Sequence, residues 1–303
     1  MNPFPPSLLT PKHWLAWLGV GLLFILAWLP WRTRHWLGKQ LGSLMYRRNH
    51  KRQHIVLTNL RLCFPGMQAI QQEQLAQEHL QYYVRALLDY SVLFFRPRLW
   101  LCQRTRIQGR EHIDQAIADG KNVILMLGHS VWLEFAPAVI GQHYRIYGSY
   151  KPFRNPVANW LIARSRLKSA EFIVAREEGL MKLVRALEPG LLMVFLPDED
   201  HGAKHSVFAP FFGVRKATLT TAARLCKLGK AAALPVMVSF DEASGQYNIA
   251  ISPPLQNYPG KDEVQDAIAL NSAMQTLIEQ QPAQYMWVLK LFRTRPAEEK
   301  PVY

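Results

Sequence analysis

Cysteine is scarce in this chain, and its first 72 residues contain no acidic side chain. The three cysteines, Cys63, Cys102 and Cys226, are far apart and form no C-x-x-C pair. An odd, scattered set excludes a disulfide framework and indicates a reducing compartment for the main domain. Internal repeats and low-complexity linkers are also lacking. With 303 residues, 49% of them hydrophobic, the chain can form a sizeable core in one large or two modest domains.

The shortage of acidic residues makes the start of the chain strongly basic. Residues 1–72 carry nine basic side chains: Lys12, Arg32, Arg34, Lys39, Arg47, Arg48, Lys51, Arg52 and Arg61. Subtracting those nine from the 36 Lys and Arg of the whole chain leaves 27 against 22 acids, so most of the net charge of +14 is local. Such an excess suits nucleic acid, an anionic membrane or an acidic protein partner.

An uncharged apolar run at residues 14–30 favours a membrane among these partners. Its length is at the lower limit for a membrane span, and Trp14, Trp17, Trp28 and Trp31 flank it as an aromatic belt would. The sequence Trp28-Leu29-Pro30-Trp31 is a poor cleavage site, and positive charge follows the run rather than preceding it, which disfavours a signal peptide. A buried core helix remains the alternative. We predict a membrane anchor over residues 1–34, single-pass or monotopic.

The basic residues directly after this run predict its orientation. By the positive-inside rule they place the main domain in the cytoplasm, and they can also bind anionic lipid head groups. Nucleic acid is not predicted as a partner, because no recognition motif accompanies the charge.

Hydrophobic periodicity predicts two helices and then alternating strands and helices. A basic amphipathic helical segment over 35–100 holds the helices 35–62 and 68–95, and an α/β domain follows over 101–303. The alternation predicts a mostly parallel sheet, with 232–252 as an antiparallel hairpin. The expected strands are 122–127, 145–150, 171–175, 191–196, 232–240 and 246–252. The expected helices are 111–119, 131–140, 156–168, 177–188, 217–228 and 262–280.

Two polar clusters follow predicted strands, at the edge where ligands of parallel sheets gather. One is Gly128-His129-Ser130, and the other is Pro197-Asp198-Glu199-Asp200-His201-Gly202. If Ser130 starts a helix, Glu134 lies in its first turn and can accept the Nδ1 hydrogen of His129. Nε2 is then free to act as a general base. The alternative is a loop histidine beside a glutamate that favours a helix N-terminus.

Other chemistries fit the sequence less well. G-H-S-V-W resembles a nucleophile elbow, but Trp132 stands where the second glycine belongs. Asp198, Asp200, His201 and His205 are potential metal ligands, yet the chain has no H-E-x-x-H. We therefore predict no metal.

Several blocks in order resemble a known family. His129 and Glu134 match the H-x4-D/E signature of glycerolipid acyltransferases. The further blocks resemble the late acyltransferases of lipid A synthesis, the lauroyl and myristoyl transferases; they are Tyr150-Lys151-Pro152-Phe153-Arg154-Asn155-Pro156, Arg166-Leu167-Lys168-Ser169, Pro197–Gly202, Val207–Gly213, Gln284-Tyr285-Met286-Trp287 and Arg293-Thr294-Arg295-Pro296. Gly128 departs from the Asn that is common before the motif histidine.

The resemblance implies a glycerol-3-phosphate-acyltransferase-like fold and a reaction at the bacterial inner membrane. A fatty acyl group would pass from an acyl carrier protein thioester to a hydroxyl of a lipid A precursor, Kdo2-lipid IVA or its penta-acylated product, with no other cofactor. His129 would be the base and Glu134 its orienting partner. Backbone N–H groups at the start of the 131–140 helix would stabilise the oxyanion. Another acceptor, such as a lysophospholipid, and thioester hydrolysis remain the alternatives.

The same resemblance suggests substrate-binding residues. Lys151, Arg154 and Arg166 would bind the phosphates of the acceptor. Asp198 and Asp200 would bind sugar hydroxyls or hold the arginines. The remaining candidates are Gly128 and Ser130 beside the histidine, and Thr218 at the expected start of a helix.

Overall fold

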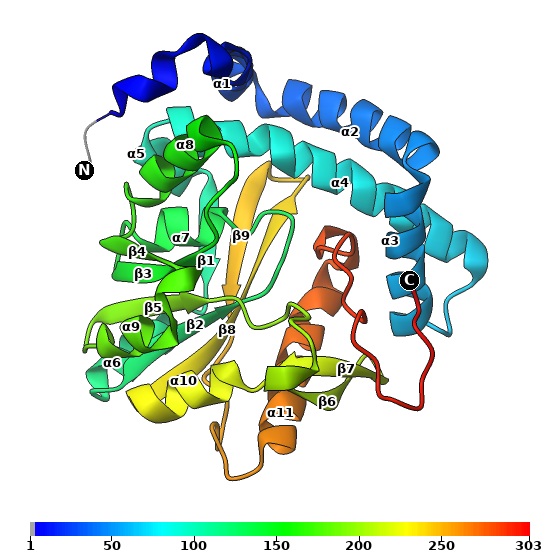
Figure 1. The fold of residues 1–303 in the computed structure, drawn as a ribbon, viewed down its shortest axis with the longest axis vertical. Helices are drawn as coiled ribbons and strands as arrows, with labels where there is room; N and C mark the ends of the chain where they lie inside the picture. Colours follow the sequence, from blue (N-terminus) through cyan, green and yellow to red (C-terminus); the bar gives the residue numbers. More distant parts are fainter. Residues whose placement is uncertain (1–3) are drawn as a thin grey trace.

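The computed structural model describes residues 4–303, and its centre is a seven-stranded sheet with the order β1-β9-β8-β2-β5-β3-β4 (Figure 1). Only β8 and β9 pair antiparallel within it. A separate hairpin joins β6 and β7. The strands are β1 (Thr105–Gln108), β2 (Asn122–Leu127), β3 (Arg145–Tyr150), β4 (Phe172–Ala175), β5 (Leu191–Phe195), β6 (Ser206–Phe211), β7 (Val214–Leu219), β8 (Ala231–Asp241) and β9 (Gln246–Ile251).

Helices flank this sheet, as the predicted α/β class requires. The first five are α1 (Trp14–Trp28), α2 (Trp31–Arg48), α3 (His50–Cys63), α4 (Ala69–Phe95) and α5 (Arg98–Gln103). The later ones are α6 (Arg110–Ala118), α7 (Phe135–Ile140), α8 (Pro156–Arg166), α9 (Leu180–Arg185), α10 (Thr221–Gly229) and α11 (Glu263–Gln280). Short 3-10 turns include Arg176–Glu178 and Ala203–His205. The mixed, mostly parallel architecture confirms the predicted fold class.

The six predicted strands are all present, but several other expectations were wrong. The expected helix at 217–228 begins only at Thr221, because residues 214–219 form β7. The expected helix at 131–140 begins at Phe135, after a turn. The segment 35–62 is interrupted at Asn49, whose side chain accepts the backbone N–H of Arg52 and caps α3. The short β1 and the β6–β7 hairpin were not predicted.

The centre of the sheet is built from apolar residues on both faces. β2 reads Asn-Val-Ile-Leu-Met-Leu, and its last five residues are buried. Continuous burial of this kind is typical of a central parallel strand covered by helices on both sides. Residues of α3 and α4 belong to the same hydrophobic cluster as the sheet. The predicted division at 1–34, 35–100 and 101–303 stays a prediction.

Two glycines allow α2 to lie against α4, which runs beneath it in Figure 1. A Cβ at Gly38 would stand 2.6 Å from the Arg85 side chain, and one at Gly42 would stand 2.4 Å from the Cα of Gln81. Small residues four apart therefore bring the two helix backbones close together.

A buried polar network fastens this helix pair to the sheet. The carboxylate of Asp89 in α4 is fully buried and accepts hydrogen bonds from Arg34 Nε at 2.6 Å and His35 Nε2 at 2.7 Å. The hydroxyl of Tyr247 in β9 donates to the same carboxylate. Burial alone would raise the pKa of Asp89, but its partners outweigh burial and lower it.

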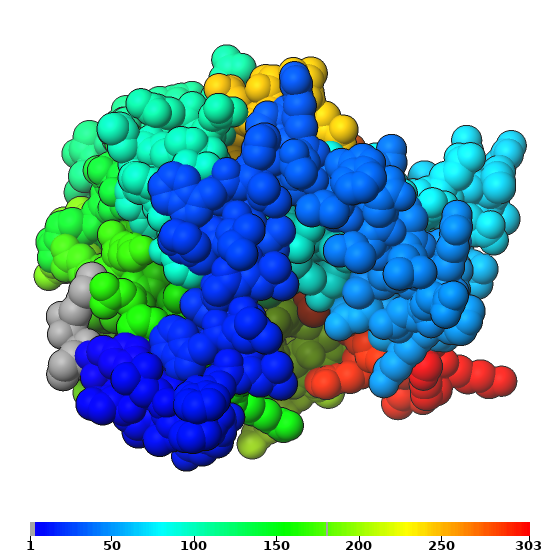
Figure 2. All heavy atoms as spheres, turned by 90° about the horizontal axis from the view of Figure 1, so that it is seen from above, coloured from blue at the N-terminus to red at the C-terminus, as the bar shows by residue number. Residues whose placement is uncertain are grey.

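The α1 helix lies on the outside of the domain. Its window Pro11–Trp28 is long and apolar enough to cross a membrane, and 6% of that window is buried. Arg96 Nε donates to Ala27 O at 2.9 Å, and the rings of Phe24 and Phe95 meet edge to face at 5.3 Å. Figure 2 shows α1 and α2 as a blue band across one face of the molecule.

Replacement of Asp89 tests the buried network. We expect Asp89→Ala to lower the free energy of unfolding by about 3–5 kcal/mol, because it leaves the Arg34 charge buried without a counter-charge. Chemical denaturation of the detergent-solubilised protein measures the change. The control is Asp119→Ala, which removes an exposed carboxylate 3.9 Å from Lys121 and should cost less than about 1 kcal/mol. Equal losses in the two variants would contradict the role of the network.

Candidate active site

The centre of the site is a histidine paired with a buried aspartate. His129 Nδ1 lies 2.6 Å from Asp198 Oδ1, and the backbone N–H of His129 donates to Asp198 Oδ2 at 2.8 Å. His129 is 8% exposed and Asp198 6%. The carboxylate holds both the ring and the backbone of His129, so Nδ1 carries a hydrogen and Nε2 takes no part in this pair.

Strand register explains why these two residues meet. β2 and β5 are adjacent and parallel, with Met126 opposite Phe195. His129 follows Met126 by three residues, and Asp198 follows Phe195 by three. Both side chains therefore reach the carboxyl edge of the sheet at the same level, where ligands of parallel sheets bind.

The C-terminal segment also holds His129 and Asp198 in place. Tyr285 donates its hydroxyl hydrogen to Asp198 Oδ2 at 2.9 Å. The backbone of Met286 donates to His129 O at 2.8 Å, and that of Val131 donates to Gln284 O at 2.8 Å. Three parts of the chain that are distant in sequence thus fix one imidazole.

The predicted pairing of His129 with Glu134 was wrong. Residues 131–134 form a turn rather than the first turn of a helix. Glu134 points instead to α8, where both of its carboxylate oxygens accept hydrogen bonds from Arg166 Nε and Nη2. Asp198, predicted to bind sugar or an arginine, takes the position that was expected for Glu134.

The backbone N–H groups that were predicted to stabilise an oxyanion already donate hydrogen bonds within the protein. The N–H of His129 binds Asp198, that of Ser130 binds Gly128 O, and that of Val131 binds Gln284 O. The N–H groups of Trp132 and Leu133 both bind Ser130, the first its hydroxyl and the second its carbonyl. Backbone donors from 129 to 133 therefore have partners already.

A second carboxylate covers the other nitrogen of the histidine. Glu199 Oε1 lies 3.3 Å from His129 Nε2, and Glu199 Oε2 lies 3.0 Å from His201 Nε2 and 3.5 Å from Arg176. Hydrogen bonds from His129 and His201 hold the pKa of Glu199 well below its usual range. Glu199 therefore occupies Nε2 of His129.

The two carboxylates set the charge of the histidine. Burial lowers the pKa of His129, but Asp198 and then Glu199 outweigh burial and raise it to about 10. Burial likewise would raise the pKa of Asp198, and the charge and hydrogen bonds of His129 lower it instead. Lys216, 1% exposed in β7, adds a buried positive charge that also lowers the pKa of Asp198.

His129 opens onto a cavity of about 630 Å³, hereafter the large cavity. Its wall includes Lys151 and Arg166, two of the predicted substrate-binding cations. His201 and His205, considered from the sequence as metal ligands, also line it. Two further cations of the wall, Arg176 and Arg224, were not singled out from the sequence. Arg154, the third predicted cation, is exposed and is not among the described residues of this wall.

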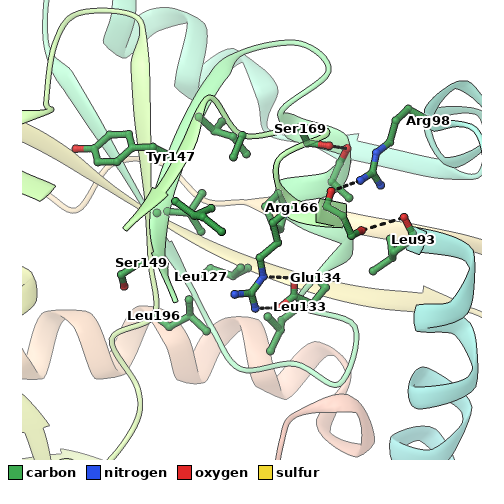
Figure 3. Close-up of a pocket in the computed structure, with 18 residues that line it drawn as sticks. Leu93, Arg98, Leu127, Leu133, Glu134, Tyr147, Ser149, Arg166, Ser169 and Leu196 are labelled. Atoms are coloured by element: carbon green, nitrogen blue, oxygen red, sulfur yellow. Dashed lines mark hydrogen bonds and ion pairs between the residues drawn. The ribbon is translucent and has the colours of Figure 1, made fainter. Parts of the chain in front are cut away.

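A smaller cavity of about 100 Å³, hereafter the inner cavity, adjoins the large one (Figure 3). The two share Leu133, Glu134, Ser149, Arg166 and Leu196. Figure 3 shows Arg166 reaching Glu134 through two contacts, with Leu133 and Leu196 beside them. The ion pair therefore lies where the two cavities meet.

The remaining predicted residues have structural partners. The Thr218 hydroxyl accepts from Asn271 Nδ2 at 2.8 Å inside β7, so Thr218 does not start a helix. Asp200 accepts the N–H of Thr294 at 2.6 Å. Ser130 is buried, and a Cβ at Gly128 would stand 2.5 Å from Met237 Cε. Within residues 4–303, no three or more His, Cys, Asp or Glu side chains form a group that could hold a metal.

A histidine held through Nδ1 by a buried carboxylate, at the wall of a large cavity, is an arrangement that suits a general base. Residues 1–294 match the family model for bacterial lipid A biosynthesis acyltransferases. The chain therefore belongs to the bacterial lipid A biosynthesis acyltransferase family.

Individual relatives agree with this assignment along nearly the whole chain. A lipid A biosynthesis acyltransferase of Haemophilus influenzae is 34% identical over 96% of this chain and 92% of its own length. The lipid A biosynthesis lauroyltransferase of Escherichia coli is 31% identical over 97% and 96%. The palmitoleoyltransferase of the same organism is 32% identical over 99% and 98%.

Replacement of Asp198 tests the electrostatics of the pair. We expect Asp198→Asn to lower the pKa of His129 from about 10 by about one to three pH units, because burial remains while the nearest negative charge is lost. Histidine-selective NMR titration measures the midpoint. Asp200→Asn, which removes a carboxylate that faces Thr294, is the matched control and should leave the midpoint unchanged. An unaltered midpoint in Asp198→Asn would refute the pairing.

Proposed function

We propose that this protein transfers a fatty acyl group from an acyl carrier protein thioester to a hydroxyl of a lipid A precursor, Kdo2-lipid IVA or its penta-acylated product. The observation that carries the proposal is the His129–Asp198 pair at the wall of the large cavity. Membership of the family supports the acceptor class. The thioester is the activated co-substrate, and the reaction needs no further cofactor.

The chemistry follows from the two nitrogens of His129. Nε2 removes the proton of the acceptor hydroxyl as its oxygen attacks the thioester carbonyl carbon. Asp198 holds the imidazolium that forms. Collapse of the tetrahedral intermediate breaks the C–S bond, and the imidazolium returns the proton to the leaving thiolate. An ester and a free carrier thiol result, with no acyl-enzyme, because both substrates occupy one site.

Glu199 makes the protonation state of His129 depend on whether the acceptor is bound. With a pKa of about 10, His129 is neutral in only about one molecule in a thousand at pH 7. An acceptor hydroxyl that replaces Glu199 at Nε2 removes one of the two charges that raise this pKa. We therefore propose that binding of the acceptor converts His129 to its basic form.

Arg166, held by Glu134, and Lys151 are proposed to bind anionic groups of the acceptor. Both line the large cavity, and a guanidinium fixed by a carboxylate on one side still presents N–H donors on the other. The protein is proposed to act at the bacterial inner membrane with the catalytic domain in the cytoplasm. The basic residues of α2 and α3 would contact anionic lipids and the acidic carrier protein.

Acyl transfer from labelled carrier thioesters to tetra- and penta-acylated precursors tests the proposal, with products read by mass spectrometry. The wild type should add one acyl group, and His129→Ala should give no detectable product while staying folded. His143→Ala, which removes an exposed histidine, should be as active as the wild type. Product from a lysophospholipid only, or free fatty acid only, would overturn the proposed acceptor. Full activity of His129→Ala would overturn the base.

The pH profile tests the role of Glu199. Because the neutral form of His129 increases with pH, kcat/KM should rise with pH toward the pKa of about 10 in the free enzyme. Glu199→Gln removes the carboxylate at Nε2, so the rising limb should move to lower pH. Glu177→Gln, an exposed neighbour, should leave the limb in place. A rising limb of the pH profile that stays in place in Glu199→Gln would contradict the proposed role of Glu199.

A further inference from the structure

One buried side chain of α3 binds the C-terminal segment just after the residues that contact the candidate base. Asn59 is 0% exposed, and its Nδ2 donates hydrogen bonds to Trp287 O and Leu289 O, both at 2.7 Å. Leu289 O also accepts the N–H of Leu291 at 3.1 Å. A helix from the start of the chain therefore supplies donors to two carbonyls that are far from it in sequence. The mechanism proposed above gives Asn59 no part.

Tyr303 fixes how this amide is turned. Its hydroxyl donates a hydrogen bond to Asn59 Oδ1 and accepts the backbone N–H of Phe292 at 3.2 Å. With Oδ1 bound to a donor and Nδ2 bound to two carbonyls, both polar atoms of the amide have partners. Tyr303 lies beside α3, as the position of the C-terminus in Figure 1 shows. The amide thus joins α3 to two parts of the C-terminal segment.

The bound carbonyls belong to a short turn that reaches the candidate base. Backbone hydrogen bonds of 2.8 and 3.0 Å within residues 285–289 close this stretch, hereafter the 285–289 turn. One side of the turn receives the hydrogen bonds of Asn59. The other side makes the contacts described above with the backbone of His129 and the carboxylate of Asp198. A displacement of the turn would therefore disturb both members of the pair.

We propose that Asn59 is a positioning residue for acyl transfer, because it holds the 285–289 turn against His129 and Asp198. Asn59 is fully buried and is not among the described residues that line the large cavity, so it acts through the turn and not on the substrate. The inference rests on the proposed function for its effect on turnover. Its effect on the geometry of the pair does not depend on which reaction the pair performs.

Replacement of Asn59 tests this role in the full chain. Asn59→Ala removes both donors to the turn, so kcat for acyl transfer should fall about 10²-fold, the size that a displacement of about 1 Å produces. The KM for the acceptor should change less than about threefold, because no group that binds the acceptor is lost. Histidine-selective NMR should show a lower titration midpoint for His129, since a looser contact with Asp198 leaves burial as the larger influence.

Tyr303→Phe is a milder variant that keeps the ring and removes only the hydroxyl that orients the amide. Here kcat should fall about threefold to tenfold, the size of one hydrogen bond, and the midpoint of His129 should fall in the same direction. Combined with Asn59→Ala, it should add less than its separate effect, because both substitutions act through one contact.

The control removes an amide that does not touch the turn. Asn122 is half-buried at the start of β2, the end of the strand away from His129, and its Nδ2 donates to Gly229 O at 2.7 Å. Asn122→Ala should keep the wild-type kcat and the wild-type midpoint of His129. Thermal unfolding followed by circular dichroism identifies a temperature at which the variants are folded, and all measurements are made there.

Three results would overturn the inference. They are a folded Asn59→Ala with the wild-type kcat and midpoint, an equal loss of kcat in Asn122→Ala, and, where Asn59→Ala does not fold, a Tyr303→Phe that matches the wild type. The midpoint is measured without substrate. A wild type that transfers no acyl group would therefore refute the proposed function, while the midpoints would still decide whether Asn59 positions the pair.

Discussion

The buried carboxylate of Asp198 is the contact on which the candidate site depends. It accepts hydrogen bonds from the ring and the backbone of His129 and from Tyr285, so it joins the ends of β2 and β5 to the C-terminal segment. A buried carboxylate is costly unless it is paired and fully hydrogen-bonded. The arrangement that satisfies Asp198 is therefore also the arrangement that fixes the direction of the His129 imidazole.

The two carboxylates that contact His129 differ in their exposure to solvent. Asp198 is buried, whereas Glu199 reaches Nε2 from the cavity side and is itself held by His201 and Arg176. In the proposed mechanism the first carboxylate orients the base, and the second competes with the acceptor for it. Glu134 binds Arg166 where the two cavities meet. Asp198 and Glu134 thus contact different partners, although the motif spacing alone placed Glu134 at His129.

Local patterns predicted the fold and the sheet edge that carries the candidate site, but not which of its side chains contact one another. The six strands and the edge that carries His129 and Asp198 follow from apolar runs and the polar clusters after them. The pairing depends on β2 lying next to β5, and strand order is not encoded in local periodicity. Tyr285 and Glu199 lie within motif blocks named from the sequence. Their contacts with Asp198 and His129 could not be predicted, because they too depend on how distant segments meet. The β6–β7 hairpin was missed because residues 217–219 lead directly into a helix.

Turnover of two matched carboxamide variants, with the lipid A precursor as acceptor, tests the central claim most directly. If Asp198 orients the base, Asp198→Asn should lower kcat by about 10⁴-fold, as neutralising a triad acid does. Glu134→Gln should then raise the KM for the acceptor through Arg166 while kcat stays within about tenfold. The reverse result, with kcat lost in Glu134→Gln and kept in Asp198→Asn, would contradict the account and restore the pairing that the motif spacing predicts.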